Sequence, residues 1–215
     1  RQFGALPPEA VGALNPNQLR QLPADTFAGF QPRQVGVLPP EAFAGFKPNQ
    51  VEALPPRAFG AMQPDQFGAL PPNAMKGIEP RQLGALPPEA MAAMRPEQMR
   101  QLPPGAIEGM KPGQVTVLPP EVFEAMRPNQ AAALPLRAFG SMQPEQIGAL
   151  PPQAFGELSP RQLGALSPEA MAGVKPQQVR QIKPDDVGAL KPTQVGALEP
   201  ESLGAMSRRQ LGQLR

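Results

Sequence analysis

The side chains of this 215-residue sequence that could do chemistry are amides, carboxylates and basic groups, because Cys, His, Trp and Tyr are absent. Without Cys or His, the sequence lacks the usual nucleophile–base pairs, thiolate zinc ligands and disulfides. The carboxylates are scattered, and Asp185-Asp186 is the only adjacent aspartate pair. No glycine-rich phosphate loop occurs. We therefore predict that the protein is not an enzyme and needs no cofactor or metal.

Glutamine is the most regular polar residue, and it recurs at every sixteenth position. Three roles fit such a column: an amide ladder that links successive turns of a repeat, a helix-capping device, or a ligand-binding stripe. Capping predicts that the side chains of Gln50 and Gln162 bond to the backbone N–H groups of Lys47 and Ser159. The column comprises Gln18, Gln34, Gln50, Gln66, Gln82, Gln98, Gln114, Gln130, Gln146, Gln162, Gln178, Gln194 and Gln210.

Basic residues recur three positions before several of these glutamines, with Glu79 as the one acidic exception. If each turn of the fold repeated at the same interval as the glutamines, these residues would line one edge. They would then form a stripe able to contact a polyanion such as a surface polysaccharide or nucleic acid. A solvated face is the alternative interpretation. The stripe would comprise Lys47, Arg95, Lys111, Arg127, Lys175 and Lys191.

An eight-residue repeat must position all of these side chains. From Leu6 to Gln213 the chain divides into 26 octads without an insertion or deletion. Positions one and six are apolar in every octad, and position three is Pro in 23 of them. Two octad types alternate. Type 1 usually has Pro-Pro at positions two and three and Ala at five, whereas type 2 has a polar residue, a single Pro and then Gln at five.

Each octad has the pattern of a short capped helix. Proline is tolerated at the first helical position, so position three predicts the helix start and position two the N-cap. The apolar residues at positions one and six then form a hydrophobic staple. Gly or Ala at positions seven and eight lets the chain turn or lets helices approach closely. We expect helices of about five to seven residues.

Helices this short need neighbours, which predicts an all-α repeat solenoid over residues 1–215. Strict alternation of the types favours two octads per turn and about 13 turns, because like would then stack on like. The alternative is a disordered proline-rich chain. In the solenoid, the large side chains at position six form the structural core, namely Phe27, Phe43, Phe59, Met91, Phe123, Phe139 and Phe155.

The half-repeat at Leu158-Ser159-Pro160-Arg161-Gln162 resembles the short Leu-x-Pro-x-Gln repeats of some large exported or surface-associated bacterial proteins. The resemblance spans essentially the whole chain and implies an extracellular or cell-surface location. The half-repeat is also superficially similar to the first helix of a TAL-effector repeat. The period of 16 leaves no loop for a base-reading pair, so we expect no sequence-specific nucleic-acid binding.

These features predict a structural protein, either a rod or stalk within a larger bacterial surface protein or a component of an extracellular filament. The chain begins inside an octad, and the pattern drifts over about residues 159–215, which suggests part of a longer array. The alternative function is a binding scaffold that presents a repeated face to a peptide or polysaccharide. The predicted partners are copies of the chain, which would associate end to end or laterally. The sequence contains no run of about 18 apolar residues, so we expect no membrane span.

Overall fold

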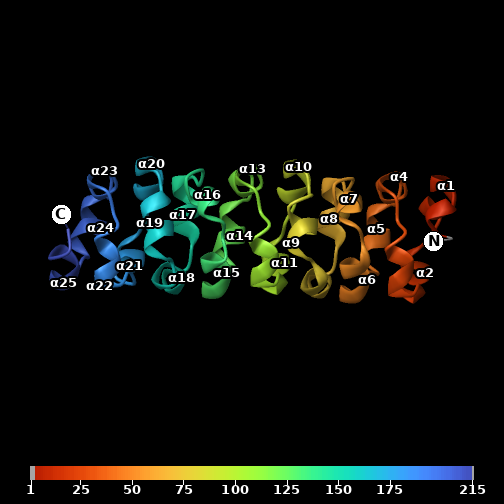
Figure 1. The fold of residues 1–215 in the computed structure, drawn as a ribbon, viewed down its shortest axis with the longest axis horizontal. Helices are drawn as coiled ribbons and strands as arrows, with labels where there is room; N and C mark the ends of the chain where they lie inside the picture. The colour runs from red at the N-terminus through yellow and green to blue at the C-terminus, as the bar shows by residue number, and fades with distance from the viewer. Residues whose placement is uncertain (1–2, 215) are drawn as a thin grey trace. The chain divides into compact units, whose positions relative to one another are not determined.

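The structure is a computed structural model that describes residues 3–214, and it divides into two compact units, Arg1–Met110 and Lys111–Arg215. Both units are built from short helices and turns (Figure 1). The first unit contains η1 (Phe3–Ala5), α1 (Pro8–Gly12), α2 (Pro16–Gln21), α3 (Ala24–Phe27), α4 (Pro32–Gly36), α5 (Pro40–Phe43), α6 (Pro48–Ala53), α7 (Pro56–Phe59), α8 (Pro64–Ala69), η2 (Pro72–Gly77), α9 (Pro80–Leu83), α10 (Pro88–Met91), α11 (Pro96–Gln101) and α12 (Pro104–Ile107). The second contains α13 (Pro112–Thr116), α14 (Pro120–Glu124), α15 (Pro128–Ala132), α16 (Leu136–Phe139), α17 (Pro144–Ala149), α18 (Pro152–Gly156), α19 (Pro160–Ala165), α20 (Pro168–Met171), α21 (Pro176–Val179), α22 (Pro184–Val187), α23 (Pro192–Val195), α24 (Pro200–Gly204) and α25 (Arg208–Leu211).

Every octad contains one helix, and each of these helices starts at position three. This holds even where Ala24, Leu136 or Arg208 replaces the proline. The N-cap residue at position two is extended, as at Lys47 with φ −102° and ψ 160°. Residues 3–214 contain no strand. The prediction of an all-α repeat of short Pro-initiated helices is therefore confirmed.

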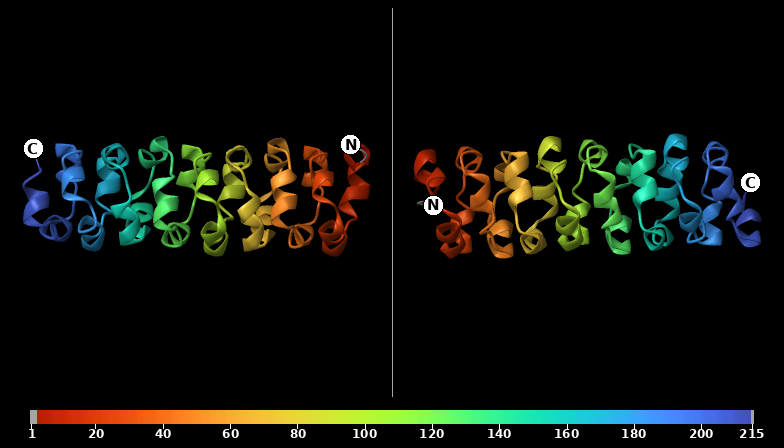
Figure 2. Two further views of the ribbon diagram at one scale, coloured as in Figure 1. Left: turned by 60° about the horizontal axis from the view of Figure 1, so that its bottom comes forward. Right: turned by 180° about the vertical axis from the view of Figure 1, so that it is seen from behind.

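Three octads make one turn, so the expected two octads and 13 turns are wrong. Within each unit a helix contacts the helix three octads away, as α4 contacts α7 and α14 contacts α17. The 13 octads of each unit thus make a little over four turns. Figure 2 shows the short helices of these turns from two further sides. We call a set of helices that contact at three-octad intervals a stack.

Like therefore does not stack on like. The two octad types alternate along the chain, and octads that stack on each other are three apart. Each type 2 octad therefore lies on a type 1 octad, and each type 1 octad lies on a type 2 octad. The stack of α5, α8 and α10 illustrates this order: α8 is type 2, and the other two are type 1. In Figure 1 the upper edge of the first unit runs through α1, α4, α7 and then α10, so its stacks wind gradually about the axis of that unit.

The core lies between turns, and each apolar position faces one direction. Position one faces the preceding turn: Leu6 of the first octad is 41% exposed, whereas Met206 of the last is 7% exposed. Position six faces the following turn: Val11 is fully buried, whereas Leu211 is 45% exposed. Aromatic contacts cross this boundary, as in the edge-on pair Phe27–Phe46, whose ring centroids lie 5.1 Å apart. Every core residue predicted at position six is buried, namely Phe27, Phe43, Phe59, Met91, Phe123, Phe139 and Phe155.

Small residues at positions seven and eight allow close approach between turns and are not needed for turning. No described residue has a positive φ, so the glycines do not form left-handed helix caps. A Cβ on Gly84 would lie 2.5 Å from the carbonyl oxygen of Gly109 in the next turn, and one on Gly148 would lie 2.7 Å from that of Gly173. Of the two roles expected for these residues, close approach is the one observed.

Candidate functional site

The glutamine column caps the type 2 helices. In each type 2 octad the glutamine Oε1 accepts a hydrogen bond from the backbone N–H of the N-cap residue. The distance is 2.9 Å from Lys47 N to Gln50 Oε1, and also from Ser159 N to Gln162 Oε1. The capping prediction is therefore confirmed for both residues on which it was made.

The same amides also link successive turns. Gln66 Nε2 donates to the carbonyl oxygens of Val35 at 2.9 Å and Leu38 at 2.7 Å, both in the preceding turn. Corresponding bonds, to carbonyls of the preceding turn, are made by Gln34, Gln50, Gln82, Gln98, Gln146, Gln162, Gln178, Gln194 and Gln210. An amide has both an acceptor and donors. Capping and the ladder, predicted as alternatives, therefore occur together.

Burial separates the structural roles from a ligand stripe. Gln66 is 2% exposed and Gln98 is fully buried, so these amides are not accessible to a ligand. Gln18 is exposed, and among the described residues it makes only the capping bonds with Asn15. For the described glutamines that bond across turns, the ligand-stripe alternative has no accessible group.

Type 1 octads explain why the column skips every second octad. Proline at their N-cap has no N–H for an amide to accept. Alanine at position five is instead buried against the preceding turn, as at Ala42 and Ala58, a core position that the sequence analysis missed. Where Ser202 occupies this position, its hydroxyl donates to the carbonyl oxygen of Val174 in the preceding turn. A short polar side chain there makes one ladder bond of the kind that glutamine makes.

The six basic residues of the predicted stripe do not align. All are exposed N-cap residues, but they do not all share one stack. In the first unit Lys47 on α6 and Arg95 on α11 are two turns apart, with η2 between them. In the second, Arg127 and Lys175 share a stack, while Lys111 and Lys191 lie in the other two. Alignment along one edge required two octads per turn, so that expectation is wrong.

The carboxylates form no metal site among the described residues. Asp185 and Asp186 lie in the first turn of α22, where a helix favours negative charge. In residues 3–214, no buried side-chain polar atom is left without a partner, and no helix is long and apolar enough to cross a membrane.

A shallow groove in the second unit could hold a ligand. Its main part has a volume of about 380 Å³ and lies over α14 and α17, between Glu124, Glu145 and Lys175. It continues past Gly148 to Pro151 and Pro152 of α18 in an adjoining hollow of about 310 Å³. Both volumes lie near the lower limit of small-molecule sites. The groove mixes prolines, small residues and both charges.

The fold and these sites define a helical repeat solenoid with an internal amide ladder. No protein-family model matches the chain. No curated protein matches it significantly.

Proposed function

We propose that the chain is a structural protein, a spacer or stalk whose repeat serves to hold its own length and shape. One observation carries the proposal: three octads per turn combined with two alternating types. Every stack therefore alternates between the types, and the side chain at position two changes from each turn to the next on every face. Solenoids that bind extended partners do so through long, continuous concave surfaces.

The polar groups support the same role. The regularly spaced glutamine amides form hydrogen bonds inside the solenoid. Every buried side-chain polar atom of residues 3–214 has a hydrogen-bond partner. The exposed charges carry both signs, as expected of a soluble surface. The resemblance to Leu-x-Pro-x-Gln repeats supports an extracellular or cell-surface location in a bacterium.

Single-molecule FRET tests the proposal directly. The sequence has no Cys, so Asn17→Cys and Glu201→Cys provide the only two labelling sites. A rigid spacer gives one narrow distance distribution, unchanged by salt. Adding Phe59→Asp should broaden it by breaking one turn. A broad distribution in the unmodified background, as in a flexible tether, would overturn the proposal.

The groove beside Glu124 and Lys175 favours a second candidate, a scaffold that binds a short peptide or oligosaccharide. Screening the full chain against peptide and glycan arrays tests it. Saturable binding that Lys175→Glu abolishes, and that Lys111→Glu, outside the groove, leaves unchanged, would favour the scaffold. The absence of binding would favour the spacer.

A further inference from the structure

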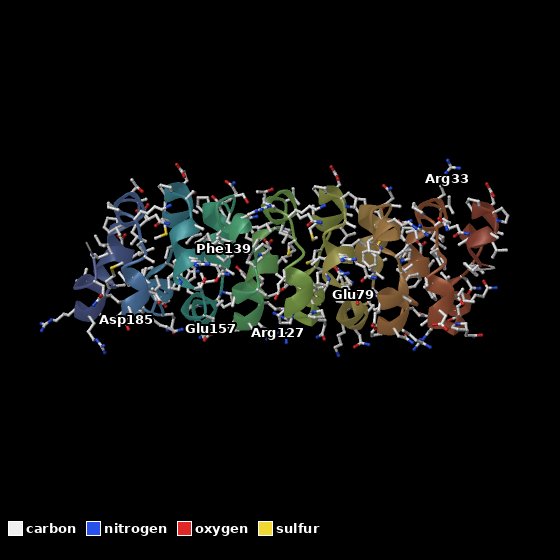
Figure 3. All side chains as sticks on the ribbon, in the orientation of Figure 1. Arg33, Glu79, Arg127, Phe139, Glu157 and Asp185 are labelled. Carbon is white, nitrogen blue, oxygen red and sulfur yellow. The ribbon has the colours of Figure 1, made fainter. Side chains whose placement is uncertain are left out.

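Over three successive turns of the first unit, the exposed charges at position four are sorted by stack, after Glu9 on α1, which precedes the arginines in their stack. One stack carries an arginine on each of three successive turns, and the next carries an acid on each. The arginine row is Arg33 on α4, Arg57 on α7 and Arg81 on α9; the acidic row is Glu41 on α5, Asp65 on α8 and Glu89 on α10. All six residues are exposed, and Figure 3 shows Arg33 extending away from the ribbon.

These two faces are otherwise almost free of charge. The six octads that hold the rows contain only one other ionisable residue, Glu79. The mixed charges of these three turns lie on the third face, in the stack of α6, η2 and α11, which carries Lys47, Glu52, Lys76, Arg95, Glu97 and Arg100. A charge distribution serving solubility alone would not distinguish the faces.

The rows do not neutralise each other within the chain. Among the described residues, no ion pair joins an arginine of the row to an acid of the neighbouring row. Position seven on both faces is Gly or Ala, as at Gly36, Ala44 and Gly60, so no long side chain at that position stands between the rows and an approaching surface.

The second unit contains a shorter version of the same arrangement. Arg137 on α16 and Arg161 on α19 form one stack, and Glu145 on α17 and Glu169 on α20 form the next. In both units the acid lies one octad after its arginine. The order of the two rows around the turn is therefore the same in each unit.

We infer that these rows form a lateral interface between two copies of the chain, the arginine row of each copy facing the acidic row of the other. The rows have the same pitch because both advance by one turn of the same superhelix. Helices stacked at about 8–10 Å space the charges by that distance, and the two rows are offset by a third of a turn, about 3 Å. Arginine side chains span such an offset.

The neighbouring acidic row makes a polyanion the poorer partner. A linear anion lying on Arg33, Arg57 and Arg81 would run beside three carboxylates one octad away, which would repel it. A second copy neutralises both rows at once. The inference deepens the proposed structural role, since laterally paired solenoids would be stiffer than single ones.

Symmetry selects the direction of pairing. A two-fold axis parallel to the solenoid axis brings the arginine row of one copy opposite the acidic row of its partner on both sides of the interface. A perpendicular two-fold axis that reverses the partner brings arginine opposite arginine. The copies should therefore pair in parallel. Because the stacks wind gradually, paired copies would also wrap about each other.

Charge reversal on the full chain tests the interface. One variant carries Arg33→Glu, Arg57→Glu and Arg81→Glu; the other carries Glu41→Arg, Asp65→Arg and Glu89→Arg. Each has two rows of one sign and should associate with itself at least tenfold more weakly than wild type in sedimentation at low ionic strength. Mixing the two variants should restore association, and about 1 M salt should abolish it.

The matched control reverses three charges on the third face, Lys47→Glu, Lys76→Glu and Arg100→Glu. It changes the net charge as much as the arginine-row variant does and should leave self-association unchanged. Fluorescent labels at Asn17→Cys on both partners should show energy transfer in the dimer, because parallel pairing brings the two labels close together. An antiparallel pair would keep the labels apart and show no transfer.

Three results would overturn the inference: a wild-type chain that stays monomeric at low salt, variants that do not associate when mixed, or a control that weakens association as strongly as the row variant. Heparin is included as a polyanion probe. Wild-type binding to heparin that the arginine-row variant loses, without self-association, would assign the row to a polyanion. A monomeric chain with a narrow FRET distribution would refute the lateral interface while leaving the spacer proposal intact.

Discussion

At the scale of single residues, the buried glutamines show why an amide and not a carboxylate occupies position five. Gln66 accepts from the N-cap N–H of Gln63 and donates to two carbonyls of the preceding turn. An ionised carboxylate can accept a hydrogen bond, as the amide oxygen does, but it has no N–H or O–H group to donate. Glutamine therefore joins the local helix start to the stacking of turns.

Replacing glutamine by glutamate separates these two roles. Gln66→Glu keeps the cap acceptor but buries a carboxylate against the carbonyl oxygens of Val35 and Leu38, so we expect a loss of about 3 kcal/mol in the free energy of unfolding. Gln18→Glu, at the exposed glutamine that only caps, should change stability by less than about 0.5 kcal/mol. Urea unfolding measures both, and equal losses would contradict the ladder.

The Gln66→Glu variant should also respond to pH. Burial beside carbonyls favours the protonated carboxyl in the folded state, so the folded protein binds more protons than the unfolded chain. Stability then falls as pH rises and recovers as pH is lowered toward the ordinary glutamate pKa of about 4.3. Thermal melts of variant and wild type between pH 4 and 8 measure the difference, which should narrow at low pH.

Substitutions at position six test whether this position packs against the following turn. Phe59 is fully buried under the following turn, so Phe59→Ala should cost about 3–5 kcal/mol. Leu211 occupies the same octad position but is 45% exposed, so Leu211→Ala should cost less than about 1 kcal/mol. Chemical denaturation compares them, and similar losses would mean that position six does not face the following turn.

At the scale of the helical element, close backbone approach decides where glycine is needed. A Cβ on Gly109 would clash with the carbonyl of Pro80 in the preceding turn, whereas one on Gly105 would meet nothing within 4 Å. Both glycines belong to the octad of α12. Backbone contact between turns, and not backbone conformation, therefore constrains this position.

The two alanine substitutions should have opposite signs. Gly109→Ala forces α12 away from the preceding turn and should destabilise the protein by about 1–3 kcal/mol. Gly105→Ala adds a methyl group in open space within a helix and should stabilise by up to about 1 kcal/mol. Calorimetric melting temperatures report both signs, and a stable Gly109→Ala would contradict the close approach.

At the scale of the whole molecule, the combination of two octad types with three octads per turn makes the effect of deletions depend on octad number. The carbonyls of Leu22 and Leu38 accept from Gln50 and Gln66, because type 2 octads lie on type 1 octads. Removing an even number of octads preserves this order. Removing a full turn of three does not.

Deleting residues 46–61 or 46–77 should therefore leave a ladder glutamine over Leu22 and Leu38. Deleting residues 46–69 removes one whole turn and places type 1 octads there, which leaves both carbonyls without a side-chain partner at about 1–3 kcal/mol each. The three-octad deletion should melt at a lower temperature than the four-octad deletion, although it removes less of the chain. A steady decline with deletion length would contradict the alternating stacks.

The octad pattern alone determined the local structure. Proline at position three, apolar residues at one and six and glutamine at five predicted the helix starts, the core positions and the capping bonds, because these depend on residues within one octad. The number of octads per turn depends on how octads stack, and a two-octad and a three-octad turn have the same local pattern. One long-range signal was present: arginines at 33, 57 and 81 and acids at 41, 65 and 89 recur at every third octad. Only the tertiary structure showed that three octads close a turn, that each amide also bonds across turns, and that the basic N-cap residues point to different faces.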